Sequence, residues 1–171
     1  AAAIGFKGAM AARRSTASMA VDQSVLIAEA AEALAAYALR EDLKAGKTVL
    51  KVDRKHALPV TQHDRERIDG FMRSFAKRQA NPAFFEVLDI ARRIAGTGSL
   101  GVERYTILIK GRGTGSGRFL LDLKAATTSA LEPYLAVKQP RWKNSAQRVV
   151  ETQRKIQAIE PALLQAVTID S

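Results

Sequence analysis

Small residues dominate a short stretch in the middle of the chain. Residues 96–101 are Gly-Thr-Gly-Ser-Leu-Gly. Glycine has no Cβ, so the backbone N–H groups of such a loop can approach phosphate oxygens closely. Ser99 lies at the predicted loop tip and would donate a further hydrogen bond. The predicted phosphate-binding residues of this loop are Gly96, Gly98, Ser99 and Gly101.

The residues after this loop argue against a dinucleotide-binding fold. In that fold the glycines open a helix, and the phosphate meets the N-terminus of the helix. Here Tyr105, Ile107 and Ile109 alternate with more polar neighbours, which is typical of a strand. A glycine loop between two antiparallel strands is instead the device that covers ATP phosphates in protein kinases.

That device also needs a lysine on the next strand, to neutralise the phosphates. Residues 119–126 are Phe-Leu-Leu-Asp-Leu-Lys-Ala-Ala, which supplies Lys124 in a comparable context. If the strand alternates, Lys124 shares a face with Leu120 and Asp122. We therefore expect its ammonium group to project from a partly buried position.

An acidic residue on the following helix would hold this lysine in place. Glu132 and Glu151 have suitable positions in the sequence. Helix geometry favours Glu151, because Glu132 directly precedes Pro133. The alternative interpretation is that residues 96–101 form a tight hairpin turn and that Lys124 is a surface lysine on an edge strand.

The first part of the chain, residues 1–88, is predicted to be mainly helical. Apolar residues recur at helical spacing from Val25 to Tyr37, which predicts a helix across residues 22–46. A short strand at 48–52 and a helix from Thr61 to Arg78 should follow. The chain begins at Ala1 and not at methionine, so this segment is expected to continue from a missing N-terminal part.

The second part, residues 89–171, is predicted to hold the glycine loop and an antiparallel sheet. The fold class is therefore α+β, with a small sheet and its glycine-loop hairpin packed against helices. We expect strands at 102–110 and 119–124 joined by residues 111–117. A short helix at 127–137 interrupted by Pro133 and a longer helix at 144–160 ended by Pro161 should follow.

The composition limits the partners of the protein. Lys and Arg total 27 against 17 Asp and Glu, a net charge of +10, which favours an anionic partner such as a nucleotide or a nucleic acid. Cysteine is absent, which excludes thiol catalysis, and two histidines leave little for a metal site. No apolar run approaches the ~20 residues that span a bilayer, so we expect a cytoplasmic protein without a membrane partner.

Four blocks of the chain resemble a bacterial family known as domain of unknown function 2252 (DUF2252). In order along the chain they are residues 89–101, 119–125, 129–135 and 147–154. The resemblance implies a distant kinase-like or aminoglycoside-phosphotransferase-like fold, so that the sheet would correspond to a kinase-like N-lobe. It also implies ATP and Mg²⁺ as cofactors, without a settled reaction.

This chain departs from the family in three respects. The family carries a Gly-Asp-x-His-x-x-Asn-Phe-Gly-like segment and an Asp-Phe-Asp-like segment upstream of the glycine loop, which would supply the catalytic aspartate and the metal ligands. Neither occurs here. The family usually has an acid where this chain has Ala125, and residues 158–161 differ from its continuation. The catalytic residues are therefore unknown, and no metal site is expected in this chain.

Three functional hypotheses remain open on the sequence. The first is an ATP-binding or nucleotide-binding lobe of a kinase-like phosphotransferase, in which Lys124 pairs with the phosphates and Glu151 orients Lys124. The second is a basic nucleic-acid-binding module, for which Trp142 between Arg141 and Lys143 could stack on a base. The third is a catalytically silent structural lobe of a larger protein. The acceptor substrate is not identified.

Overall fold

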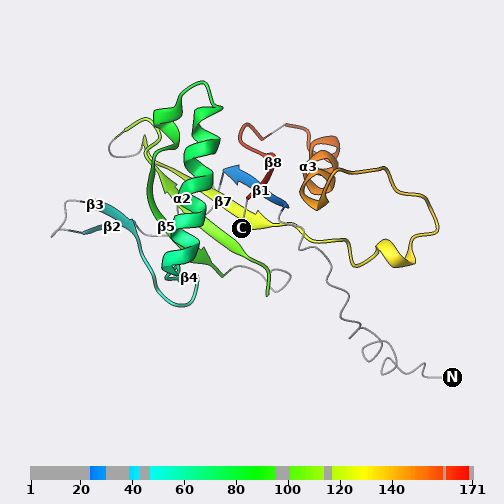
Figure 1. The fold of residues 1–171 in the computed structure, drawn as a ribbon, viewed down its shortest axis with the longest axis horizontal. Coiled ribbons are helices and arrows are strands. Elements are labelled where there is room, and N and C mark those ends of the chain that lie inside the picture. The colour runs from blue at the N-terminus through cyan, green and yellow to red at the C-terminus, as the bar shows by residue number, and fades with distance from the viewer. Residues whose placement is uncertain are drawn as a thin grey trace.

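The structure is a computed structural model that describes residues 24–29, 39–42, 47–94, 101–113, 117–159 and 161–169. Six strands form one antiparallel sheet in the order β4-β5-β6-β7-β1-β8 (Figure 1). Their bounds are β1 (Ser24–Glu29), β4 (Ala57–Leu58), β5 (Val87–Arg93), β6 (Arg104–Ile109), β7 (Phe119–Ala125) and β8 (Gln165–Thr168). A separate antiparallel pair consists of β2 (Leu39–Asp42) and β3 (Lys47–Leu50).

Two α-helices accompany the sheet, α2 (Gln62–Lys77) and α3 (Ser145–Ile156). Each begins at a side chain that satisfies a free backbone N–H group of the first turn. Thr61 accepts from the N–H of Asp64 at 3.1 Å, and Asn144 accepts from the N–H of Gln147 at 2.8 Å. The 3₁₀ turns η1 (Pro82–Phe85) and η4 (Glu132–Tyr134) complete the helical elements of the described residues.

Helix α2 covers one face of the sheet, as Figure 1 shows. Its apolar stripe, with Ile68 and Phe75, packs on residues of the central strands that include Ile107 and Leu121. The opposite face carries a smaller core, in which Leu50 of β3 packs with neighbours that include Leu108. Both faces of β6 and β7 are therefore covered, which explains why apolar residues occupy nearly every position of these two strands.

Helix α3 lies on the face opposite α2. Val167 of β8 packs against the core beneath α2, so the neighbouring Ala166 belongs to the other face. Ala166 lines one cleft together with Val150 of α3. Helix α3 therefore covers β1 and β8 on the side of the sheet that carries Lys124, because Lys124, Leu26 and Ala166 are in register across β7, β1 and β8.

The prediction of mixed helices and antiparallel sheet is confirmed. Strands β3, β6 and β7 and helix α2 occur where they were expected, and β6 and β7 pair as an antiparallel hairpin. Helix α3 also occurs, although it ends at Ile156. The described part of residues 1–88 contains four strands besides α2, and strands from both sides of residue 88 pair in one sheet. The division into two domains at that point stays a prediction.

Two helices expected from the sequence are wrong. The range 22–46 contains β1 and β2 where it is described, because Val25 and Ile27 are good strand formers and β1 pairs with both β7 and β8. In the range 127–137 only the turn Glu132–Tyr134 is helical. Pro133 lacks the N–H group that a longer helix would need.

Replacing Ile68 with alanine should destabilise the protein by roughly 2–5 kcal/mol, because its side chain is 0% exposed in the core beneath α2. The matched control is Ile156→Ala in α3, where the side chain is 78% exposed and the change should cost less than about 0.5 kcal/mol. Urea unfolding of both variants measures the difference. Equal losses would contradict the packing described above.

Candidate functional site

The glycine loop joins β5 to β6, which pair as antiparallel neighbours. Gly96, Gly98 and Ser99 lie outside the described residues, so their predicted contacts stay predictions. Gly101 is described and has a φ of +82°, a backbone conformation that favours glycine. The connection therefore ends at a position whose backbone conformation favours glycine over residues with a Cβ.

Three basic residues lie side by side next to this loop. The register places Arg104 of β6 opposite Lys124 of β7. On the other side, Arg92 of β5 is opposite Tyr105 of β6, so continuing this register by one residue puts Arg93 next to Arg104. Residues in register on neighbouring strands share a face. We call Arg93, Arg104 and Lys124 the cationic row. It crosses three strands at the end of the sheet where the loop begins and ends.

Asp122, almost buried, holds two members of the cationic row. Arg104 donates from Nε to the Asp122 Oδ1 at 2.9 Å and from Nη2 to Oδ2, while Arg93 donates from Nη1 to Oδ2 at 3.0 Å. Such two-point contacts between guanidinium and carboxylate fix the orientation of the guanidinium plane. The two guanidinium groups therefore share one carboxylate, which joins β5, β6 and β7.

Lys124 adds a third positive charge to the row. It lies on the same face as Leu120 and Asp122 and is partly buried, as the alternation predicted. Its strand lies between β6 and β1, so the alternative interpretation of Lys124 as an edge-strand lysine is wrong. Among the side chains that the structure describes, none forms an ion pair with the Lys124 ammonium group.

Glu151 is not brought together with Lys124 in this structure. It lies on α3, where its Oε1 is 3.6 Å from Nη1 of Arg154. It lines a cleft of about 630 Å³ between α3 and β8, together with Lys143 and Gln165 among others. Helix α3 nevertheless covers β1, the strand next to Lys124, on the same face. The predicted Lys124–Glu151 contact stays a prediction.

A second basic segment, which the sequence did not reveal as part of the site, lies beside the loop. Strand β4 pairs with the end of β5, with Ala57 opposite Arg93. The N–H of Ile94 donates to the carbonyl of His56 at 2.8 Å, just before the glycine loop. The turn of residues 53–56 is thereby held next to Ile94, at the end of β5. It contributes Arg54 and Lys55, both exposed, to this end of the sheet.

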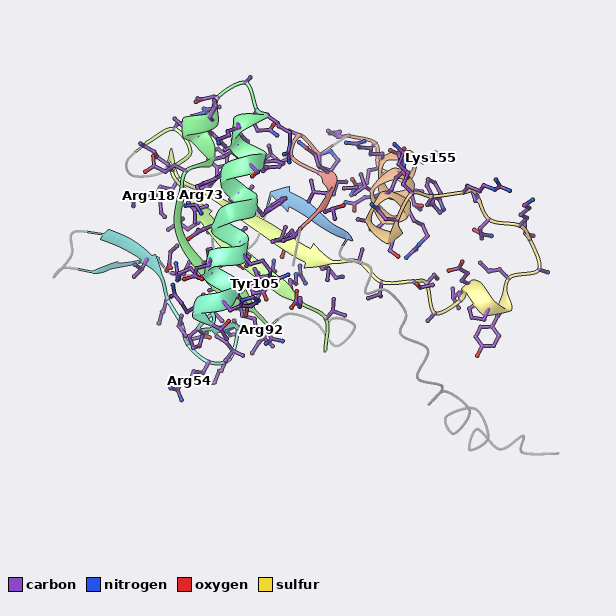
Figure 2. The ribbon with its side chains drawn as sticks, in the orientation of Figure 1. Arg54, Arg73, Arg92, Tyr105, Arg118 and Lys155 are labelled. Atoms are coloured by element: carbon purple, nitrogen blue, oxygen red, sulfur yellow. The ribbon has the colours of Figure 1, made fainter. Side chains whose placement is uncertain are left out.

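Asp53 fixes the shape of this turn. Its carboxylate accepts from the N–H groups of Lys55, His56 and Ala57 at 2.7–3.1 Å, and from Nδ1 of His56 at 2.7 Å. These hydrogen bonds, that of the His56 N–H first, hold the pKa of Asp53 well below its usual range. Arg54 has a φ of +62°, so the turn presents its side chain from a left-handed conformation. Figure 2 shows Arg54 at the same end of α2 as Arg92 and Tyr105.

The strand that follows the loop is anchored to α2 by a polar cluster. Arg67 donates from Nη2 to Glu103 at 3.0 Å, to Asp64 at 3.3 Å and to the hydroxyl of Tyr105 at 3.4 Å. Burial, and then the negative charges of Glu103 and Asp64, raise the pKa of Tyr105 to about 12. The cluster joins the residues just after Gly101 to a helix, which limits their movement.

Other expected features can be placed as well. His56 is mostly exposed, and Asp64 contributes to the cap of α2. The Nζ of Lys155 lies 5.8 Å from the centroid of the Trp142 ring, so one face of that ring has a cation over it.

Within the described part of the chain, no group of three His, Asp or Glu residues could hold a metal ion. None of the described helices is long and apolar enough to cross a membrane.

The sequence missed Arg93 and Arg104 as site residues. Arg92 is exposed, whereas Arg93 is largely buried against Asp122. Their spacing about the glycine loop could have revealed them. Arg93 and Arg104 each lie three residues outside the range 96–101, and equidistant residues become cross-strand neighbours in a symmetric hairpin.

These features define a protein of mixed helix and antiparallel sheet with a basic, glycine-flanked site at one end of the sheet. The chain belongs to a family described as uncharacterized protein conserved in bacteria (DUF2252), whose sequence profile matches residues 2–171. Comparison with curated proteins and with solved structures gave no match.

Replacing Asp122 with alanine should destabilise the protein by about 3 kcal/mol, because it removes the carboxylate that two largely buried guanidinium groups share. The matched control is Glu86→Ala, which removes a half-exposed partner of Lys110 and should cost less than about 1 kcal/mol. Urea unfolding measures both. Equally small losses would show that Asp122 does not hold the row.

The raised pKa of Tyr105 predicts a loss of stability in alkali. The folded protein favours the neutral phenol, so this contribution is complete below the ordinary tyrosine pKa of about 10 and is lost as the pH rises through about 12. The wild type should therefore lose stability relative to Tyr105→Phe between these two values. Urea unfolding across this pH range measures the difference, with Tyr134→Phe at an exposed position as the control. A constant difference would contradict the buried environment of the hydroxyl.

Proposed function

We propose that this chain is the nucleotide-binding lobe of a kinase-like phosphotransferase and that ATP phosphates bind between the glycine loop and the cationic row. The observation that carries the proposal is the row itself. Arg93, Arg104 and Lys124 are aligned on three adjacent strands beside the loop, and Asp122 is the carboxylate that Arg93 and Arg104 share. Partly buried basic side chains that lie side by side favour an anionic ligand.

The order of the elements supports the same proposal. A strand, the glycine loop, a second strand, a strand that carries Lys124 and then helix α3 follow one another along the chain. In protein kinases a glycine-loop hairpin, a strand lysine and a helix with a glutamate occur in that order. Glu151 keeps its proposed role for the nucleotide-bound state, in which it would exchange Arg154 for Lys124.

The residues present fit the phosphate part of ATP better than they fit a metal ion by themselves. Guanidinium and ammonium groups donate charge-assisted hydrogen bonds to phosphate oxygens. Mg²⁺ prefers oxygen ligands and commonly binds through substrate phosphates plus one or two carboxylates. In this proposal the metal would arrive on the nucleotide, and phosphoryl transfer would rely on positioning and on neutralising charge.

The groups that complete such a reaction are proposed to lie outside this chain. The family resemblance implies a catalytic aspartate and metal ligands in segments that the 171 residues do not contain. The acceptor of the phosphoryl group is left open, because one fold can serve many acceptors.

Titrating Mg-ATP into the protein by calorimetry should give saturable binding, and Lys124→Ala should weaken it at least tenfold. The reason is the loss of one charge-assisted contact, worth about 1.5–3 kcal/mol. The matched control is Lys110→Ala, which removes the same charge from an exposed lysine at the far end of β6 and should leave the affinity within about twofold.

Flat heats for the wild type would reject the proposal. Unchanged affinity in Lys124→Ala would remove its central residue. Binding of single-stranded DNA that weakens linearly with the logarithm of salt concentration, without any response to Mg-ATP, would favour the nucleic-acid module instead.

A further inference from the structure

The two edge strands of the six-stranded sheet, β4 and β8, differ in how they are protected (Figure 1). Edge strands of natural proteins avoid pairing with foreign chains by being very short or by carrying charged residues or proline. Strand β4 consists of Ala57 and Leu58 and is followed directly by Pro59. Strand β8 has four residues, Gln-Ala-Val-Thr, without a charge or a proline. Of these two edges, β8 is therefore the one open to pairing.

The outer side of β8 has unpaired backbone groups. On its inner side all four residues are in register with β1. In an antiparallel strand every second residue directs its N–H and C=O away from that neighbour. Two residues of β8 therefore direct these groups outward, and in the part of the chain that the structure describes no strand pairs with them there. An extended peptide that adds as a further strand would satisfy these groups.

A cleft on each face of the sheet reaches this edge. The cleft of about 630 Å³ beside α3, here the α3 cleft, is lined by Gln165 and Ala166. A cleft of about 290 Å³ beside α2, the α2 cleft, is lined by Thr168, Ile169 and Gly70. Consecutive strand residues point to opposite faces, so a cleft that contacts two of them extends to the strand edge. Alternate side chains of an added strand would therefore meet one cleft or the other.

Each cleft offers a cation. Lys143 lines the α3 cleft and Arg78 lines the α2 cleft, and both side chains are exposed. No residue that the structure describes forms an ion pair with either of them. The glutamate of each cleft, Glu151 or Glu66, has a partner on its own helix. The clefts therefore favour acidic side chains on the added strand.

We propose that the β8 edge binds an extended acidic peptide of a partner protein, with two acidic residues three positions apart. Val167 and Ile169 pack in the core beneath α2, so Ala166 belongs to the face of α3. Peptide residues opposite Ala166 and Ile169 are three positions apart and point to different faces, one toward each cleft. Backbone hydrogen bonds would supply the affinity, and the two acids would supply the specificity.

The charge of the protein favours this occupant over a second copy of the chain. Each copy has a net charge of +10 and presents the same two cations at this edge, so pairing of two β8 strands would bring like charges together. The proposed edge site uses neither the glycine loop nor the cationic row. It is therefore independent of the proposed nucleotide site and can succeed or fail alone.

The first experiment measures the fluorescence anisotropy of the labelled peptide Thr-Val-Glu-Val-Thr-Glu-Val-Thr with the protein at a fixed salt concentration. Binding should be saturable and about tenfold tighter than that of the same peptide with glutamine in place of glutamate. The matched control, Thr-Val-Glu-Val-Glu-Thr-Val-Thr, has the same charge but places both acids on one face. It should bind about fivefold more weakly. Absence of binding, or equal binding of the two acidic peptides, would overturn the inference.

The second experiment tests strand pairing without changing the protein. Two forms of the acidic peptide carry N-methyl groups on alternate residues, one on the odd and one on the even positions. Only one set of peptide N–H groups faces β8. One form should therefore lose binding at least tenfold, while the other should bind within about threefold of the parent peptide. Equal affinity of the two forms would show that the peptide does not add as a strand.

The third experiment assigns the acids to the clefts. Lys143→Gln and Arg78→Gln should each weaken binding of the acidic peptide about threefold to fivefold and leave binding of the glutamine peptide unchanged. The matched control, Lys110→Gln, changes an exposed lysine at the far end of β6 and should leave the affinity within about 1.5-fold. Effects of all three variants that are equal would indicate attraction by net charge alone and would overturn the inference.

The last measurement repeats the peptide titration in the presence of Mg-ATP. The affinity for the peptide should not change, because the edge site lies apart from the cationic row. Displacement of the peptide by Mg-ATP would overturn the inference and leave the proposed function standing. Peptide binding by a protein that does not bind Mg-ATP would reject the proposed function alone. A protein that forms dimers in sedimentation and does not bind the peptide would assign the edge to a second copy and overturn the inference.

Discussion

The carboxylate of Asp122 is the interaction on which the loop end of the sheet depends. It lies on an inner strand, almost fully buried, and it accepts from Arg104 on the neighbouring strand and from Arg93 one strand further. A buried guanidinium without a partner would cost several kcal/mol, so the contacts with Asp122 help the two arginines to occupy this face. The same carboxylate thus joins β5, β6 and β7 and fixes the orientation of the two guanidinium groups.

Burial on both faces of the central strands makes this arrangement rigid. Helix α2 packs on one face, and β3 and α3 lie on the other. The backbone N–H of Leu50 donates to the carboxylate of Asp89 at 2.9 Å, which ties β3 to β5, and Arg67 ties the start of β6 to α2 through Glu103. A binding loop placed between two such strands has fixed ends, so an ordered ligand site can be built on it without a large core beneath the loop.

The sequence predicted well the elements that local signals define, and it predicted poorly the elements that depend on pairing between distant strands. The hairpin of β6 and β7 and the start of α2 follow from alternation, glycine placement and capping, all of which are local signals. The strand β1 was mistaken for a helix, because its pairing with β7 involves partners about a hundred residues away. Glycine content alone indicated the loop, and alternation alone placed Lys124 on the same face of its strand as Asp122. The partners of Asp122 and the turn at Arg54 depend on which strands pair, and no residue type encodes this directly.

The cationic row also has a thermodynamic consequence for the protein without ligand. Arg93, Arg104 and Lys124 repel one another at strand spacing, and the contacts of Asp122 with Arg93 and Arg104 counter that repulsion. In the proposed function an anion bound at the row would counter it further and would stabilise the fold by mass action. The cations that repel one another in the folded sheet would then be the groups that supply the affinity for the ligand, so stability and binding would be linked through the same side chains.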